Sequence, residues 1–214
     1  MQLSEMTVVV GTAHRRRLRG KQSPDGRLRE YAYSRQVAAE VCAALRQRGC
    51  KCEVDLMDAD LPRQMQAPVE KVETQRELAM RVNLVNELCR QQGAGRVLYV
   101  SIHVNAFGSD GQWHSPCGWQ VCVSPQGSER SKMLAACLYD AAQAHWLRVR
   151  KPAQAQKFWA QSLYVLNQTA CPAVLTENLF QDNRKDVDFL LTDAGRQAIV
   201  ALHVEGITKY IESL

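Results

Sequence analysis

Four residues that stand far apart in the sequence have the types that metal-assisted hydrolysis needs: His14, Glu30, His103 and Glu177. Two histidines and one carboxylate make a catalytic zinc site with three protein ligands, whose fourth position stays open for water. A further glutamate nearby is the usual proton carrier for that water. The set therefore predicts this chemistry if the fold brings the four side chains together.

The two histidines each follow an apolar run. Residues 6–10 predict a buried strand ahead of His14, and residues 96–102 predict another that leads into His103. In an α/β fold, ligands and catalytic groups collect where parallel strands end. If these two strands are neighbours, their ends share one edge of the sheet and the histidines meet there. For His14 taken alone, a hydrogen-bonded loop histidine is a more common case than a metal ligand.

The two glutamates occupy comparable places. Glu177 ends the apolar run 173–176, and a buried strand rarely ends in an acid that has no partner. Glu30 opens a long amphipathic helix, so its first turn could present the carboxylate to the strand ends. The helix dipole also stabilises a carboxylate there, which is explanation enough for Glu30 taken alone.

Apolar periodicity supplies the elements that must position these residues. Strands are expected at 6–10, 51–57, 96–102, 119–123 and 173–177. Helices are expected at 30–49, 73–92, 129–146 and 193–212, whereas the stretch 147–172 has no clear assignment. This alternation predicts an α/β fold with a mostly parallel, twisted sheet of about five to six strands and helices on both faces. No linker or repeat divides residues 1–214, so one domain is expected.

Length and composition agree with one globular domain. The chain has 214 residues, of which 46% are hydrophobic and 23% charged. No apolar run approaches the roughly 20 residues that span a bilayer. The first residues lack the basic and apolar regions of a secretory signal. The expectation is a protein made in the cytoplasm that stays there or leaves by another route.

The net charge is +5, and much of the positive charge lies within residues 15–29. A solvated loop is the plainer interpretation, and a basic rim that attracts a polyanion is the functional one. No zinc-finger spacing, helix-turn-helix or RNA-binding aromatic motif accompanies this charge, so nucleic acid is not the expected partner.

The eight cysteines contain no C-x-x-C pair, which disfavours a cysteine zinc knuckle. Cys42 and Cys89 fall in expected helices, where buried thiols behave as small apolar side chains. Cys50 and Cys52 are too close in sequence to bridge one another easily. Free thiols are therefore expected throughout.

Two motifs carry a family resemblance that extends over nearly the whole chain. Residues 101–106 read SIHVNA, and residues 172–180 read PAVLTENLF and are followed by Asn183. A closing GIxxY spans 206–210. The sequence resembles the zinc-dependent N-acetylmuramoyl-L-alanine amidases, which are the catalytic domains of many autolysins and phage endolysins. The family usually opens with DPGHGG, whereas this chain has GTAHRR at 11–16.

The resemblance implies that His14, Glu30 and His103 bind one Zn²⁺ and that Glu177 is the catalytic acid/base. The reaction that it implies is hydrolysis of the amide between N-acetylmuramic acid and L-alanine in peptidoglycan. Asn105 could contact substrate, orient a ligand or cap its own loop. A monomeric catalytic domain is expected, without a separate cell-wall-binding module.

Three alternatives remain open at this point. One is a different zinc peptidase that cuts elsewhere in the stem peptide, and another is a catalytically degenerate cell-wall-binding module. The third is a basic nucleic-acid-binding protein, whose binding would depend steeply on salt. Because peptidoglycan lies outside the membrane, an amidase of this kind would act after release through a membrane lesion or by non-standard export.

Overall fold

The computed structural model describes residues 1–152 and 156–214. Six strands in this part of the chain form one sheet in the order β2-β1-β3-β6-β4-β5. Its strands are β1 (Thr7–Thr12), β2 (Lys51–Val54), β3 (Val97–Asn105), β4 (Gln120–Val123), β5 (Trp159–Ala160) and β6 (Ala173–Phe180). All paired strands are parallel except β4 and β6, which run antiparallel. The mostly parallel sheet predicted from sequence is confirmed.

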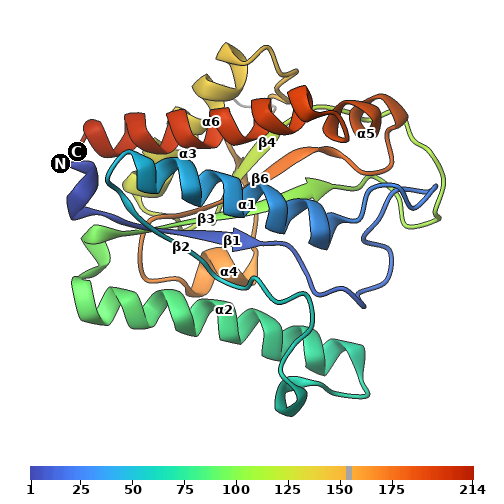
Figure 1. Cartoon of the computed structure of the whole chain (residues 1–214), viewed down its shortest axis with the longest axis horizontal. Coiled ribbons are helices and arrows are strands. Elements are labelled where there is room, and N and C mark those ends of the chain that lie inside the picture. The colour runs from blue at the N-terminus through green and yellow to red at the C-terminus, as the bar shows by residue number, and fades with distance from the viewer. Residues whose placement is uncertain (153–155) are drawn as a thin grey trace.

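Helices cover both faces of this sheet, also as expected. The helices are α1 (Glu30–Gln47), α2 (Glu70–Gln92), α3 (Glu129–Ala144), α4 (Tyr164–Gln168), α5 (Arg184–Leu190) and α6 (Asp193–Glu212). Figure 1 shows α1, α3 and α6 on one side of the sheet, with α2 and α4 on the other.

Alternate residues of each central strand enter two different cores, because strand side chains point to opposite faces. Val8 and Val10 of β1 pack in the core beneath α1, α3 and α6. Val9 of β1 and Tyr99 of β3 belong to the second core, beneath α2 and α4. Both faces are buried, which explains why these strands read as continuous apolar runs.

Two strands are longer than their apolar runs. β3 continues to Asn105 and β6 to Phe180, so His103 and Glu177 lie inside strands and not at their ends. The expectation that these residues end their strands is therefore wrong. Both strands continue past these polar residues because their backbones stay in register, with His103 opposite Glu177. Residues 153–155, within the unassigned stretch 147–172, lie outside the described part of the chain.

The cysteines depart from expectation at one pair. Cys42 of α1 and Cys52 of β2 form a disulfide, with their Cα atoms 5.3 Å apart. The prediction of free thiols is wrong here because α1 packs directly on β2 and brings the two side chains together. The other six cysteines are free thiols.

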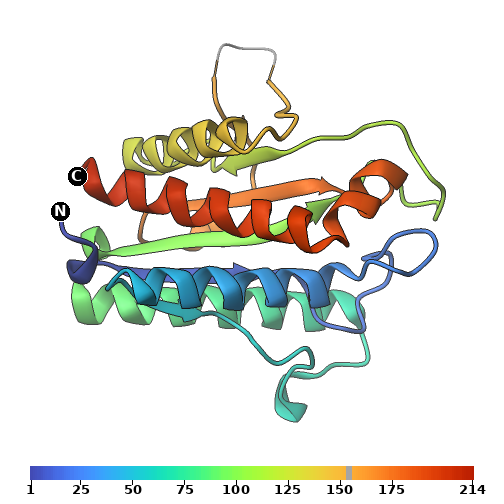
Figure 2. The same ribbon diagram turned by 45° about the horizontal axis from the view of Figure 1, so that its top comes forward.

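Both chain termini lie at the same end of the sheet. Figures 1 and 2 show the N-terminal segment beside the last turn of α6. The strands β1, β3 and β6 start at this end and point away from it. Among the described residues, no helix combines the length and apolar character that a membrane crossing requires.

Candidate functional site

Three of the predicted side chains meet at the far edge of the sheet. One nitrogen from each of His14 and His103 and one carboxylate oxygen of Glu30 lie within 4.8 Å of one another. Glu30 Oε1 is 3.1 Å from His103 Nδ1, and Oε2 is 3.3 Å from His14 Nε2. The two imidazole rings stand nearly perpendicular, with centroids 5.1 Å apart.

Neighbouring elements hold each member of this cluster. β1 and β3 are adjacent and parallel, which places the segment after β1 beside His103. Glu30 is the first residue of α1, is 1% exposed, and its Oε1 accepts a hydrogen bond of 3.1 Å from the Val104 N–H. The backbone of Ala13 is tied to α1, because its N–H donates to Ser34 Oγ and its carbonyl accepts from Arg35.

His14 adopts a left-handed backbone conformation, with φ of 42°. Such a conformation costs a residue other than glycine roughly 1–3 kcal/mol and persists only where surrounding structure enforces it. Here the contacts of Ala13 with α1 enforce it. The loop therefore presents the histidine without the glycines of the DPGHGG motif.

Glu177 lies beside this cluster on β6, in register with His103 on β3. Its Oε2 is buried and has no hydrogen-bond partner among the described residues. Burial raises the pKa of Glu177 to about 8, and the charge of Glu30 adds to that rise while Lys21 opposes it. This carboxyl group is consequently able to hold a proton near neutral pH.

The donor set fits a zinc ion. Burial raises the pKa of Glu30, but His14 and His103 outweigh it and hold that pKa well below its usual range. Burial also lowers the pKa of His103, which keeps the ring neutral with a lone pair for a metal. Oε2 of Glu30 is buried and makes no hydrogen bond within the described residues. Two imidazoles and one carboxylate match the ligands of catalytic zinc sites.

Asn178 is a supporting residue that the sequence did not single out. Its Nδ2 donates to the carbonyl of His103 at 2.9 Å and to Thr176 Oγ1 at 3.1 Å. Its Oδ1 accepts from the indole N–H of Trp119 at 2.8 Å. The side chain thus joins β3, β6 and the residue just before β4, next to Glu177. Its place directly after Glu177 in the motif was the available signal.

A buried ionic network supports β1 from the α2 side. The carboxylate of Asp55 accepts hydrogen bonds from the Thr12 N–H at 2.9 Å and from Arg81 at 2.7 Å. Arg81 also pairs with Glu77, which in turn pairs with Arg15 at 3.1 Å. All four charged residues are less than 9% exposed. The network fixes the end of β1 immediately before the His14 loop.

The side chain of Arg15 is buried, so the basic loop at 15–29 is not solvated along its whole length as expected. Arg15 is 3% exposed because it pairs with Glu77 and with Glu73 on α2. Arg16, Arg17 and Arg19 are exposed, so the basic rim begins one residue later than the charge run suggests.

Within the described residues, the side chain of Asn105 makes only a local hydrogen bond. Its Oδ1 accepts from the Ala106 N–H at 2.9 Å, which is the loop-capping role. A contact with substrate or with a metal ligand stays a prediction. Of the other histidines, His203 is fully buried, whereas His114 and His145 pair with acidic groups at the surface.

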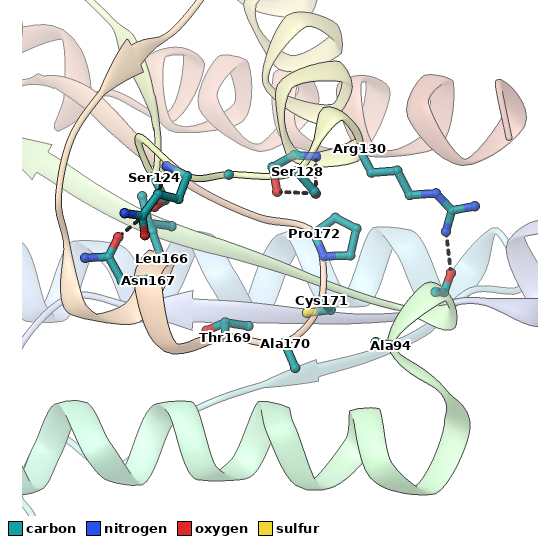
Figure 3. Close-up of a pocket in the computed structure, with 14 residues that line it drawn as sticks. Ala94, Ser124, Ser128, Arg130, Leu166, Asn167, Thr169, Ala170, Cys171 and Pro172 are labelled. Carbon is teal, nitrogen blue, oxygen red and sulfur yellow. Dashed lines mark hydrogen bonds between the residues drawn. The ribbon is translucent and has the colours of Figure 1, made fainter.

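Two cavities lie in contrasting places. One of about 190 Å³ is lined by His14 and His103 together with apolar side chains from α2, α4 and β6. Another of about 380 Å³ lies at the starts of β3 and β6, where Ala94 and Pro172 line it with Ser128 of the α3 N-terminus (Figure 3). The second cavity is at the opposite end of the sheet from the cluster of His14, Glu30 and His103, and none of these three residues lines it.

Comparison with known proteins decides the family. Residues 8–209 match the family described as N-acetylmuramoyl-L-alanine amidase. The chain belongs to this family. The resemblance carried by its sequence motifs is thereby confirmed, and the chain is assigned to a class of amidases.

Individual relatives of this amidase chain agree with that assignment. The endolysin of Bacillus phage SPP1 is 28% identical over 128 residues, which are 60% of this chain and 45% of the endolysin. The chain therefore matches less than half of the length of this curated relative.

Solved amidase structures share the fold. The CwlD amidase of Clostridioides difficile, in complex with the GerS lipoprotein, superposes with a TM-score of 0.80 at 18% identity, over 98% of this chain and 100% of CwlD. An N-acetylmuramoyl-L-alanine amidase of Clostridium difficile 630 gives 0.77 at 20% identity, over 97% of each chain. The Ami1 amidase of Mycobacterium smegmatis gives 0.76 at 18% identity, over 100% of each.

Proposed function

We propose that this chain is a zinc-dependent N-acetylmuramoyl-L-alanine amidase that cuts the amide between N-acetylmuramic acid and L-alanine in peptidoglycan. The observation that carries the proposal is the cluster of His14, Glu30 and His103 beside Glu177, whose Oε2 is buried and has no hydrogen-bond partner among the described residues. Family membership supports the choice of bond.

In this proposal His14, Glu30 and His103 hold the ion. A zinc ion bound there would polarise the scissile carbonyl and lower the pKa of a water molecule. Glu177 accepts the proton of the attacking water and then passes it to the nitrogen of the departing amine. Asn178 keeps the backbone of His103 in register with Glu177, so the base and the ligand set stay side by side.

The place of action stays a prediction. The substrate lies outside the cell membrane, and release through a membrane lesion or non-standard export would bring the protein to it. The monomeric state is a prediction of the same standing.

The test compares wild type with Glu177→Gln and with Glu53→Gln, an exposed glutamate of β2 that serves as the matched control. Zinc per chain is measured by atomic emission, and digestion products of purified peptidoglycan by mass spectrometry with amino-terminal analysis. We expect about one zinc in all three proteins. Wild type and Glu53→Gln release L-alanine amino termini, while Glu177→Gln loses roughly 10²–10⁴-fold in rate.

Two of the rival functions, the stem-peptide peptidase and the degenerate wall-binding module, have their own outcomes in this experiment. Bound zinc together with new amino termini other than L-alanine would mean that a different bond is cut, and would favour the stem-peptide peptidase. Binding to peptidoglycan without products from any variant favours the degenerate module. A protein that takes up no zinc and still releases L-alanine termini would refute the metal-dependent mechanism.

A further inference from the structure

A third cavity, of about 180 Å³, lies between two loops at residues 20–24 and 108–112. Glycine, serine and glutamine residues of these loops line it together with Gln181 and Asp182, which directly follow β6. Gln181 is 3% exposed and Asp182 is 5% exposed. None of the three residues of the candidate zinc site lines this cavity, so it is a separate place in the fold.

Asp182 brings a carboxylate to this cavity with only one of its two oxygens engaged. Oδ2 accepts hydrogen bonds of 2.8 Å from the backbone N–H groups of Phe107 and Gly108. Oδ1 is buried and has no hydrogen-bond partner within the described residues. Burying a polar atom without a partner costs free energy, so a ligand that contacts Oδ1 would be stabilised there.

No cationic side chain neutralises this carboxylate. Within residues 1–152 and 156–214, the two backbone groups are the hydrogen-bond donors to the Asp182 side chain, and it forms no ion pair. The neighbouring Asp186 adds negative charge: burial raises the pKa of Asp186 and Asp182 adds to the rise, while backbone hydrogen bonds and Arg148 oppose it. Because buried charges in proteins are paired or coordinate metal ions, a bound cation would supply the counter-charge that Asp182 needs.

Gln181 provides a second unused oxygen at the same cavity. Its Nε2 donates to the carbonyl of Gly20 at 2.8 Å, which fixes the orientation of the side-chain amide. Its Oε1 is buried and makes no hydrogen bond in the described part of the chain. Two buried oxygens without partners, one amide and one carboxylate, are therefore contributed by consecutive residues that line one cavity.

The chemistry of the lining favours a hard cation over other ligands. A water molecule or a sugar hydroxyl would satisfy the two acceptors, but it would leave the charge of Asp182 uncompensated. The lining contains no histidine or cysteine, which disfavours zinc. Ca²⁺ accepts about six to eight oxygen ligands in flexible geometry, from carboxylates, amide and backbone carbonyls and water, whereas Mg²⁺ demands a near-ideal octahedron.

We propose that this cavity binds a calcium ion through Asp182 Oδ1, Gln181 Oε1 and further oxygens of the two loops. This ion is distinct from the zinc of the proposed function and takes no part in the chemistry of amide hydrolysis. Its role is structural, because it joins residues 20–24 to residues 108–112 across the end of β6.

Both loops lead directly to the candidate zinc site. The first is tied to Glu30, whose N–H donates to the carbonyl of Lys21 at 3.0 Å. The second follows β3, the strand that carries His103. A calcium ion between the loops would consequently hold the segment before Glu30 against the segment after His103.

The first experiment measures calcium binding by calorimetric titration of the zinc-loaded protein with calcium chloride. We expect one ion per chain, with a dissociation constant of about 10⁻⁴–10⁻³ M because a single carboxylate takes part. Asp182→Asn keeps an oxygen for the two backbone donors but removes the charge, and should weaken binding at least roughly tenfold. His103→Ala should bind calcium as wild type does, because His103 belongs to the other site.

Asp110→Asn is the matched control for this titration. Asp110 is an exposed aspartate of the same loop that pairs with His114 and does not line the cavity. Its replacement should leave the dissociation constant unchanged. If Asp110→Asn loses calcium binding and Asp182→Asn keeps it, the ion binds at the surface and the proposal is wrong.

The second experiment follows urea unfolding with and without calcium at constant ionic strength. At a calcium concentration about ten times the dissociation constant, the folding equilibrium constant of wild type should rise roughly tenfold, and that of Asp182→Asn should not respond. In calcium-free buffer, Asp182→Asn should be at least as stable as wild type, because it removes an uncompensated buried charge. Gln181→Met, which removes one ligand and keeps the charge, is the second variant and should respond more weakly than wild type.

Hydrogen exchange locates the ion in the fold. Calcium should slow exchange of the backbone amides at residues 20–24 and 106–112 in wild type and leave both loops unchanged in Asp182→Asn. Absence of a saturable calcium effect on wild type, or a larger response to magnesium than to calcium, would overturn the proposal. Either result leaves the amidase function intact, because none of its proposed catalytic or zinc-binding residues is involved.

Discussion

His14 shows how a single residue can be held in an unfavourable conformation for a purpose. Its φ of 42° would suit glycine, yet the chain places an imidazole there and an arginine directly after it. The contact of Ala13 with α1 and that of Arg15 with α2 offset the free-energy cost of this backbone conformation. A motif search that requires the glycines would overlook this histidine, whereas its residue type and its position after β1 identified it.

The proximity of the four central residues could be predicted from sequence. His103 and Glu177 stand out because polar residues rarely follow buried apolar runs, whereas His14 and Glu30 gain weight only in combination with them. Asn178 and Arg81 could not be singled out in this way. The function of each depends on partners distant in sequence, Trp119 for Asn178 and Asp55 for Arg81, and one sequence does not reveal which polar groups will be buried together.

His203 gives a prediction for acid stability. It is fully buried between the carbonyl of Ile199 and the hydroxyl of Thr176, and burial lowers its pKa to about 4. The unfolded chain therefore binds a proton more readily between pH 6.5 and 4, and stability is lost as pH falls through that window. We expect a loss of about 2 kcal/mol at pH 5 from this residue. Urea unfolding of wild type and His203→Gln at pH 7 and pH 5 measures it.

Comparison of wild type with His203→Gln cancels the contributions of other acid-sensitive groups. Carboxylates contribute equally to both proteins, so only the difference between their pH slopes belongs to His203. Identical slopes between pH 7 and pH 5 would show that the buried imidazole does not resist protonation.

At the scale of elements, the central strands and the four long helices followed from apolar periodicity, but the ends of β3 and β6 did not. An apolar run stops at the first polar residue, whereas a strand continues for as long as the neighbouring backbone pairs with it. β3 and β6 pair with each other past His103 and Glu177, which extends both strands beyond their runs. β5 has two residues and leaves no periodic signal at all.

The ionic network between β2 and α2 supports a second prediction. Arg81→Met removes the positive charge that neutralises Asp55 and Glu77, while it keeps the volume of the aliphatic stem. Because an uncompensated charge is then left in the interior, we expect the free energy of unfolding to fall by about 3–5 kcal/mol. Chemical denaturation followed by circular dichroism measures the change.

A comparison with Arg90→Met isolates the effect of burial. Arg90 also lies on α2 and pairs with Glu87, but it is exposed, and its replacement should change stability by less than about 1 kcal/mol. Equal effects at the two positions would mean that the network does not hold β1 in place.

The disulfide that ties α1 to β2 makes a third prediction. Cys42 and Cys52 are ten positions apart. A cross-link that closes a loop of this length lowers the conformational entropy of the unfolded chain, which stabilises the folded state by about 3 kcal/mol. Reducing agent should lower the free energy of urea unfolding by this amount in wild type and leave Cys42→Ala/Cys52→Ala unchanged. A drop of the same size in the double variant would assign the effect to other cysteines.

At the scale of the molecule, the cluster of His14, Glu30 and His103 joins three segments of the chain. The loop after β1, the first turn of α1 and strand β3 each supply one of its three side chains, and none of them forms the cluster without the others. A zinc ion bound in the folded state alone should therefore stabilise the whole domain by mass action.

This coupling is open to calorimetry. At a free zinc concentration one hundred times the dissociation constant, the free energy of unfolding should rise by about 2.7 kcal/mol. Removal of zinc by a chelator should reverse the rise, and His103→Ala should show none. A similar rise in His103→Ala would place the stabilising ion elsewhere, for example on the free thiols.

The neighbouring ends of the chain have a practical consequence. Both termini lie at the end of the sheet where β1, β3 and β6 start (Figures 1 and 2), whereas His14 and His103 lie toward the opposite end of β1 and β3. A tether at either end would hold the domain to a bead or a sensor surface with its reactive edge turned outward. The same closeness suits joining the two ends by a short peptide and opening new ones in an outer loop, so that the domain could be inserted into a host protein as a cassette.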